Sequence, residues 1–219
     1  MLVDDFQVLL KKLKNNFGYL NEVDAVLQEV LPYQPSTIID YHPAGMIKVL
    51  KTIEEASVED FKKIIMLSCI EKNWNDFSSV NYTPAVLGYF DKFFDRVMNV
   101  CEAKEGWDGQ HPDVYWKELA IARKIMFPSG AQVAEKYSGF SIKQGIHLKK
   151  ISTLSFIKYL VLSGSRKGYY QTHLYAPGLD EFNQQGWCER HVRLADMLKL
   201  HVDIKGTFGV TWLVDPQLL

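Results

Sequence analysis

The 219-residue sequence lacks the features that mark several large classes of protein. It has only three, widely separated cysteines, which is typical of reduced intracellular thiols rather than of a disulfide framework. Its 25 basic and 26 acidic residues leave a formal net charge of −1, which argues against binding nucleic acid by phosphate neutralisation. No apolar run approaches the roughly 18 residues of a membrane span, and the acidic start has no signal-peptide pattern. We therefore expect a cytoplasmic protein that binds neither nucleic acid nor a membrane.

Short motifs that carry known chemistry are also missing. The sequence contains no Cys-x2-Cys pair and no Glu-x2-His on a predicted helix, so we expect no metal site. It has no Walker phosphate loop and no Gly-x-Gly-x-x-Gly, which gives no support to nucleotide binding through a glycine-rich loop. The absence of Gly-x-Ser-x-Gly removes the usual serine-hydrolase turn.

What is present predicts an α+β fold with a substantial core, because 47% of the residues are hydrophobic. Apolar residues recur at three- and four-residue spacing from residue 4, which predicts a largely helical region over 1–137. Its last helix is predicted to start at His111 and to end at residues 127–128. From 138 to 219 we predict a small β-β-α-β segment that packs on the helical part as one unit. Its elements are a hairpin of strands at 152–163 and 169–176, a helix at 182–200 and a strand at 204–214.

One predicted strand carries an unusually polar face. Alternation along 169–176 places Tyr169, Gln171, His173 and Tyr175 on the same side. Such a face is costly to bury dry, so it is expected to meet water, a ligand or a polar network. His173 is a candidate general base, with Tyr175 or Tyr169 as the proton donor.

A second cluster lies in a loop and the helix that follows it. Trp107, His111 and Trp116 stand close together in the sequence among glycines. These residues either form the rim of a substrate-binding pocket or belong to a helix connection whose tryptophans are buried in the core. Both interpretations stay open.

The last 80 residues carry a resemblance to a known group of proteins. Residues 170–174, Gly186-Trp187, and the stretch from Lys205-Gly206 to Trp212 look like a family of uncharacterised bacterial proteins. The order strand, strand, helix, strand is also similar to the central part of GCN5-related N-acetyltransferases. That family's Gln/Arg-x-x-Gly-x-Gly/Ala signature is represented here only by the fragment 184–186.

The acetyltransferase resemblance implies an acyltransferase-like protein with acyl-CoA as co-substrate. The pantetheine would pair with the strand at 169–176, and the pyrophosphate would lie at the N-terminus of the following helix. In that arrangement His173 is the base and Tyr175 or Tyr169 the acid. The cofactor would be held by Gln171, Gln185, Gly186 and Trp187.

Two alternatives stand beside this hypothesis. The chain stops shortly after the predicted strand at 204–214, which leaves a sheet edge that invites pairing. The first alternative is therefore a non-catalytic binding or assembly protein, a homo-oligomer whose sheet is completed by a partner chain. The second is a protein that binds a small-molecule ligand in a pocket lined by Trp107, His111 and Trp116.

Overall fold

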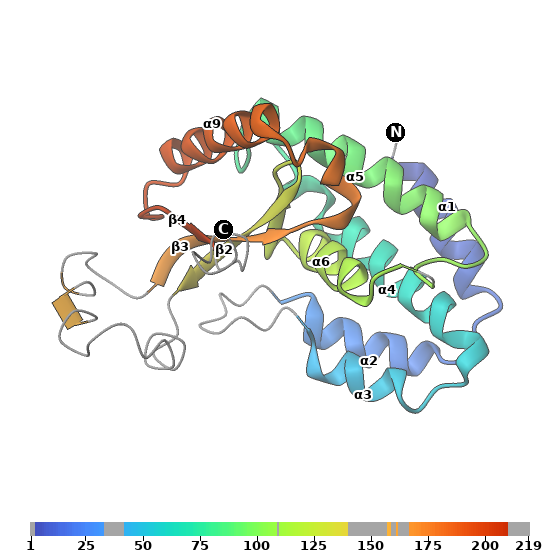
Figure 1. Ribbon diagram of the computed structural model, residues 1–219. Coiled ribbons are helices and arrows are strands. Elements are labelled where there is room, and N and C mark those ends of the chain that lie inside the picture. The colour runs from blue at the N-terminus through green and yellow to red at the C-terminus, as the bar shows by residue number, and fades with distance from the viewer. Residues whose placement is uncertain are drawn as a thin grey trace.

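A computed structural model describes residues 3–32, 42–108, 110–139, 157–158, 161 and 167–209 and confirms the α+β fold (Figure 1). The α-helices that precede the sheet are α1 (Val3–Lys14), α2 (Leu20–Val30), α3 (Ala44–Leu50), α4 (Val58–Asn73), α5 (Pro84–Glu102) and α6 (Pro112–Ala122). Two short 3-10 helices, η1 (Glu55–Ser57) and η2 (Trp74–Asp76), flank α4. Among these helices, none is long and apolar enough to span a bilayer.

Helix α4 is the centre of the helical part. It is buried almost all round, with Phe61, Ile64, Ile65 and Leu67 at zero exposure, and it packs against α1, α2 and α6. A helix that is apolar on every side has no solvent-facing stripe, so it must lie inside a domain. Helices α1 and α2 each contribute one apolar face to this core.

The sheet has four strands in the order β1-β2-β3-β4, which is also their order along the chain. They are β1 (Met126–Pro128), β2 (Gln132–Gly139), β3 (Lys167–Leu174) and β4 (Thr207–Gly209). The first three strands pair antiparallel, and β4 runs parallel to β3. The parallel pair is joined through η3 (Ala176–Glu181) and α9 (Gln184–Leu200), because parallel neighbours require a crossover connection.

Helix α9 covers one face of the sheet (Figure 1). The Tyr170 hydroxyl on β3 reaches the Met197 carbonyl at 3.4 Å and His201 Nδ1 at 2.6 Å. Leu194 and Met197 of α9 are buried in the common core. The helical part and the sheet therefore share one core.

The sheet begins earlier in the chain than predicted. The helix expected to run to residues 127–128 ends at Ala122, and Lys124 follows it in the left-handed conformation with φ 65°. Strands β1 and β2 then start inside the region predicted to be helical. Strand β1 and residues 132–135 of β2 are buried, so their apolar residues do not alternate with polar ones as they do in a half-exposed strand.

The partner of β3 also differs from the prediction. The expected hairpin joins 152–163 to 169–176, whereas β3 pairs antiparallel with β2, placing Val133 opposite His173. Most of 152–163 lies outside the described residues, and its described positions 157–158 and 161 are helical. The strand predicted at 204–214 is confirmed over Thr207–Gly209. Residues 210–219, on which the proposed oligomer edge depends, lie outside the described part.

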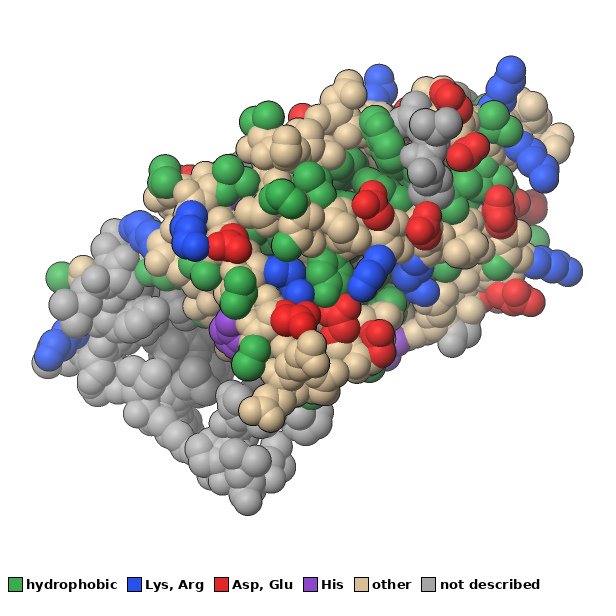
Figure 2. All heavy atoms as spheres, turned by 90° about the horizontal axis from the view of Figure 1, so that it is seen from above, with side chains coloured by type: hydrophobic (Ala, Val, Ile, Leu, Met, Phe, Trp, Pro, Cys, Tyr) green, Lys and Arg blue, Asp and Glu red, His purple; other side chains and the backbone are tan. Residues whose placement is uncertain are grey.

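The described surface mixes charges of both signs. Figure 2 shows acidic and basic side chains interspersed over the face seen from above. Within the described ranges, no three His, Cys, Asp or Glu side chains are placed to hold a metal ion.

Candidate functional site

A buried carboxylate, Glu118 of α6, organises the most polar part of the core. Its side chain has zero exposure and accepts three hydrogen bonds from distant parts of the chain. Trp107 Nε1 donates to Oε2 at 2.5 Å, and Tyr175 Oη donates to Oε1 at 2.7 Å. Arg96 Nε donates to Oε1 at 2.6 Å. Because an unpaired buried charge is very costly, these partners hold Glu118 and are in turn held by it.

The protonation states of this cluster follow from burial and charge. Burial, followed by the Glu118 charge, raises the pKa of Tyr175 well above its ordinary value, so the hydroxyl remains a donor. Burial lowers the pKa of Arg96, but the charge and hydrogen bonds of Glu118 and Tyr175 together raise it more, and the net direction is upward. The cluster therefore holds a permanent cation and a neutral phenol around Glu118.

Arg96 is fixed in place at two of its three nitrogens. Besides the bond from Nε to Glu118, Nη2 donates to Gln110 Oε1 at 2.5 Å. The guanidinium also interacts with the Tyr175 hydroxyl, and 29% of the Arg96 side chain is exposed. A guanidinium held this way is preorganised to donate to a planar or tetrahedral anion.

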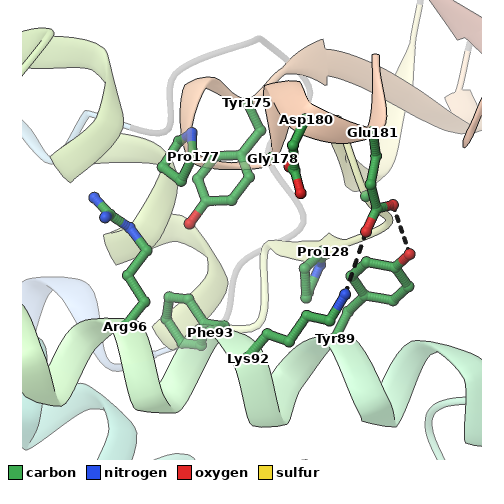
Figure 3. Close-up of a pocket in the computed structure, with 11 residues that line it drawn as sticks. Tyr89, Lys92, Phe93, Arg96, Pro128, Tyr175, Pro177, Gly178, Asp180 and Glu181 are labelled. Carbon is green, nitrogen blue, oxygen red and sulfur yellow. Dashed lines mark hydrogen bonds and ion pairs between the residues drawn. The ribbon is translucent and has the colours of Figure 1, made fainter. Parts of the chain in front are cut away.

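Arg96 and Tyr175 lie at one end of a cavity between α5 and η3 (Figure 3). We call it the α5–η3 cavity; its volume is about 200 Å³. Its lining includes aromatic rings and charged groups, among them Tyr89, Lys92, Phe93, Arg96, Tyr175 and Glu181. An aromatic wall with a few convergent polar groups is the usual composition of a small-molecule site.

The opposite end of the cavity is built around Glu181 of η3. Its carboxylate accepts from Tyr89 Oη at 2.6 Å and from Lys92 Nζ at 3.2 Å, and it lies 3.5 Å from Arg193 Nη2. Burial raises the pKa of Glu181, but these donors lower it further than burial raises it. Burial, followed by the hydrogen bond to Glu181, raises the pKa of Tyr89 to about 12. Glu181 is thus a fixed anion, whereas the neighbouring Asp180 carboxylate points into the cavity in Figure 3.

A second, more open hollow continues the cavity along α5. It has a volume of about 460 Å³, and it shares Arg96 and Pro177 with the first. Its other walls come from Asn99, Val100 and the loop that includes Gln110. Arg96 therefore stands where the two hollows meet.

The η3 segment that closes the cavity is held by close backbone packing. A Cβ added at Gly178 would lie 2.4 Å from the Gly130 carbonyl oxygen, so only glycine fits there. Gly130 itself has φ 100° in the turn between β1 and β2, a conformation that favours glycine. These two glycines place η3 directly against the β1–β2 turn.

The start of α9 is equally tight. Asn183 caps the helix, its Oδ1 accepting from the Gly186 amide at 2.9 Å. A Cβ at Gly186 would lie only 2.0 Å from the Glu181 carbonyl oxygen. The structure thus gives Gly186 a packing role at the junction of η3 and α9.

The four residues that were predicted to share one polar strand face have different surroundings in the structure. Tyr175 joins the Glu118 cluster, whereas His173 Nε2 lies 2.9 Å from Glu135 Oε2 on β2. Gln171 is buried, and Tyr169 packs edge-on against Phe208, with ring centroids 6.2 Å apart. The proposed acid–base pair of His173 and Tyr175 therefore has separate partners.

The loop tryptophans do not line the α5–η3 cavity. Trp107 is buried, and its indole Nε1 contacts Glu118 rather than the cavity. Trp116 packs against the His42 ring, with centroids 5.0 Å apart. His111 caps α6 by accepting from the Asp113 amide at 3.3 Å, and it lines a separate small hollow.

The predicted cofactor residues of α9 have local partners. Gln185 Nε2 donates to Glu189 Oε1 at 2.9 Å, and the Trp187 ring lies 4.2 Å from the guanidinium carbon of Arg190. Sequence reasoning missed Arg96 and Glu118. The sequence feature that could have indicated a buried acid is the position of Glu118 directly before the apolar run Leu119–Ala122.

Comparison with known proteins adds no information on identity: no family model, no curated protein and no solved structure matches the chain. The function must therefore be argued from the site itself, because a fold alone does not determine a function.

Proposed function

We propose that the protein binds a small polar molecule in the α5–η3 cavity and that Arg96 and Tyr175 contact it. The observation that carries this proposal is the fixation of Arg96 by Glu118 and Gln110 at the edge of the cavity. A buried carboxylate is costly to maintain, and Glu118 holds the partly exposed Arg96 as well as Trp107 and Tyr175. Orienting Arg96 offsets this cost, because a preorganised guanidinium loses less entropy when a ligand binds.

The lining indicates the chemical class of the ligand. Arg96 favours a carboxylate or phosphate group, and Phe93 offers an apolar surface beside it. The Tyr175 hydroxyl donates its proton to Glu118, so towards a ligand it acts as an acceptor for a hydroxyl or ammonium group. Asp180 accepts hydrogen bonds, which suits a hydroxyl or ammonium group elsewhere on the same ligand. A volume of about 200 Å³ limits the enclosed part to a small metabolite.

This proposal predicts a binding defect in Tyr175→Phe. The substitution removes one hydroxyl from the cavity and leaves the ring, so a ligand bonded to that hydroxyl should bind about tenfold more weakly. A panel of small hydroxy acids, amino acids and phosphomonoesters is screened by ligand-observed NMR. The hits are then titrated calorimetrically against the wild type and the variant.

Tyr89→Phe is the matched control, because it removes the hydroxyl at the far end of the same cavity. It should leave the affinity for the anionic group within about twofold, whereas Arg96→Lys, which loses the planar fork, should abolish binding. If no panel member binds, or if Tyr89→Phe and Tyr175→Phe weaken binding equally, the assignment to the Arg96 end is wrong.

The acyl-thioester hypothesis is our second candidate, favoured by one observation. Strands β3 and β4 are parallel and are joined through α9, which is the arrangement that the acetyltransferase resemblance implies. In this proposal acyl-CoA lies along β3 and the start of α9, with Gln171, Gln185 and Trp187 near it.

Gln185→Glu tests this candidate without disturbing the packing at Gly186. Gln185 is exposed in the first turn of α9, so the substitution adds a negative charge where a diphosphate would sit. Acetyl-CoA, CoA and a long-chain acyl-CoA are titrated in a thermal-shift assay. At 100 times its dissociation constant a ligand adds about 2.7 kcal/mol of stability, and Gln185→Glu should reduce that shift. No shift with any of the three in the wild type excludes the candidate.

A further inference from the structure

A separate polar cluster surrounds Lys136 of β2. Its Nζ donates to Tyr82 Oη at 2.7 Å and lies 4.1 Å from the centroid of the Tyr82 ring. The side chain is mostly buried but keeps some exposure to solvent. Neither residue lines the α5–η3 cavity, so this cluster is independent of the function proposed above.

Lys136 is a cation without a matching anion. Within the described part of the chain, no carboxylate lies within ion-pair distance of its Nζ. The nearby Asp76 pairs with another cation, Lys124. His201 faces the same region and is bonded through Nδ1 to the Tyr170 hydroxyl.

These surroundings favour the neutral amine. Burial, followed by the charge of Lys124, lowers the pKa of Lys136 to about 7, and Asp76 opposes the shift only in part. Burial, followed by the charge of Lys136, lowers the pKa of His201, so that ring is neutral at neutral pH and adds no further positive charge. A free amine next to a second cation and a phenol is the combination that activates lysine as a nucleophile.

We propose that Lys136 is a reactive amine that condenses with the carbonyl group of a small aldehyde or ketone. The nitrogen lone pair forms a C–N bond, and the carbonyl π electrons move to oxygen, which takes up a proton. The resulting carbinolamine loses water as the C=N bond forms, giving an imine and one H2O. Tyr82, 2.7 Å from the nitrogen, is placed to carry the proton from nitrogen to the departing oxygen.

Competitive labelling of the unmodified, full chain tests the proposal. The protein is treated with limiting acetaldehyde and sodium cyanoborohydride, whose hydride traps the imine as a secondary amine, and alkylation of each lysine is measured by peptide mass spectrometry. At pH 7, Lys136 should be labelled at least tenfold faster than the exposed Lys12. Its rate should reach half its maximum near pH 7, whereas the reactivity of an ordinary lysine amine, with a pKa of about 10.4, keeps rising well above that pH.

Lys63 is an internal control for burial alone. It is 4% exposed, and its Nζ donates to the Ala103 carbonyl at 2.7 Å, so it should be labelled no faster than Lys12. Tyr82→Phe should slow labelling of Lys136 while leaving Lys12 unchanged. Lys124→Met should move the half-maximal pH at Lys136 upward, because the neighbouring cation is removed. Labelling of Lys136 at or below the rate of Lys12 in the wild type would overturn the proposal.

Discussion

Glu118→Gln is expected to lower the free energy of unfolding by about 3 kcal/mol, because it removes the buried anion that pairs with the partly buried Arg96. The amide also offers one acceptor oxygen where the carboxylate offers two, while Trp107 still donates to one of the two positions and Tyr175 to the other. One NH2 group must then face a donor. For a chain of this size the loss corresponds to a fall in Tm of about 6–12 °C, measured by calorimetry.

Glu102→Gln provides the matched control for this change. Glu102 is an exposed acid at the end of α5, so the same substitution there should alter stability by less than about 0.5 kcal/mol. If the two variants unfold at the same temperature, Glu118 does not hold the cluster together and Arg96 is not preorganised by it.

Gly186→Ala is expected to cost about 2–3 kcal/mol of stability. The new Cβ would lie 2.0 Å from the Glu181 carbonyl oxygen and 2.9 Å from its carbon, and neither backbone atom can rotate away. The start of α9 and η3 must therefore separate, which strains a core that is already closely packed. Because η3 also closes the α5–η3 cavity, ligand binding there should weaken together with stability.

Gly88→Ala should have the opposite sign. Gly88 is exposed in the middle of α5, and nothing lies within 4 Å of a Cβ placed there. Alanine is the better helix former by roughly 1 kcal/mol, so this variant should be slightly more stable than the wild type. A Gly186→Ala variant as stable as the wild type would contradict the packing role and would leave room for a phosphate group at that turn.

The helices could be predicted because their signals are local. The three- and four-residue spacing of apolar residues from residue 4 predicted a largely helical region, and α1 to α6 lie within it. The end of α6 was missed because the apolar run continues through residues 125–127, which form β1 instead. Short buried strands and buried helices have the same apolar composition, and only their partners distinguish them.

The candidate site could be predicted only in part. Tyr175 was identified because a polar strand face requires partners, but its partner Glu118 is 57 residues away in the sequence. His173 and Tyr175 were expected to act as one acid–base pair. In the structure His173 instead contacts Glu135 of β2, a strand that was not predicted.

The sequence by itself determined the fold class, the polar strand and most helices, because periodicity, caps and composition act over a few neighbouring residues. The tertiary structure alone decided which charges meet at Arg96 and Glu118, where β3 finds its neighbours, and why Gly186 must be glycine. Those outcomes depend on contacts between segments far apart in the chain, where burial removes water and makes each polar group depend on one particular partner.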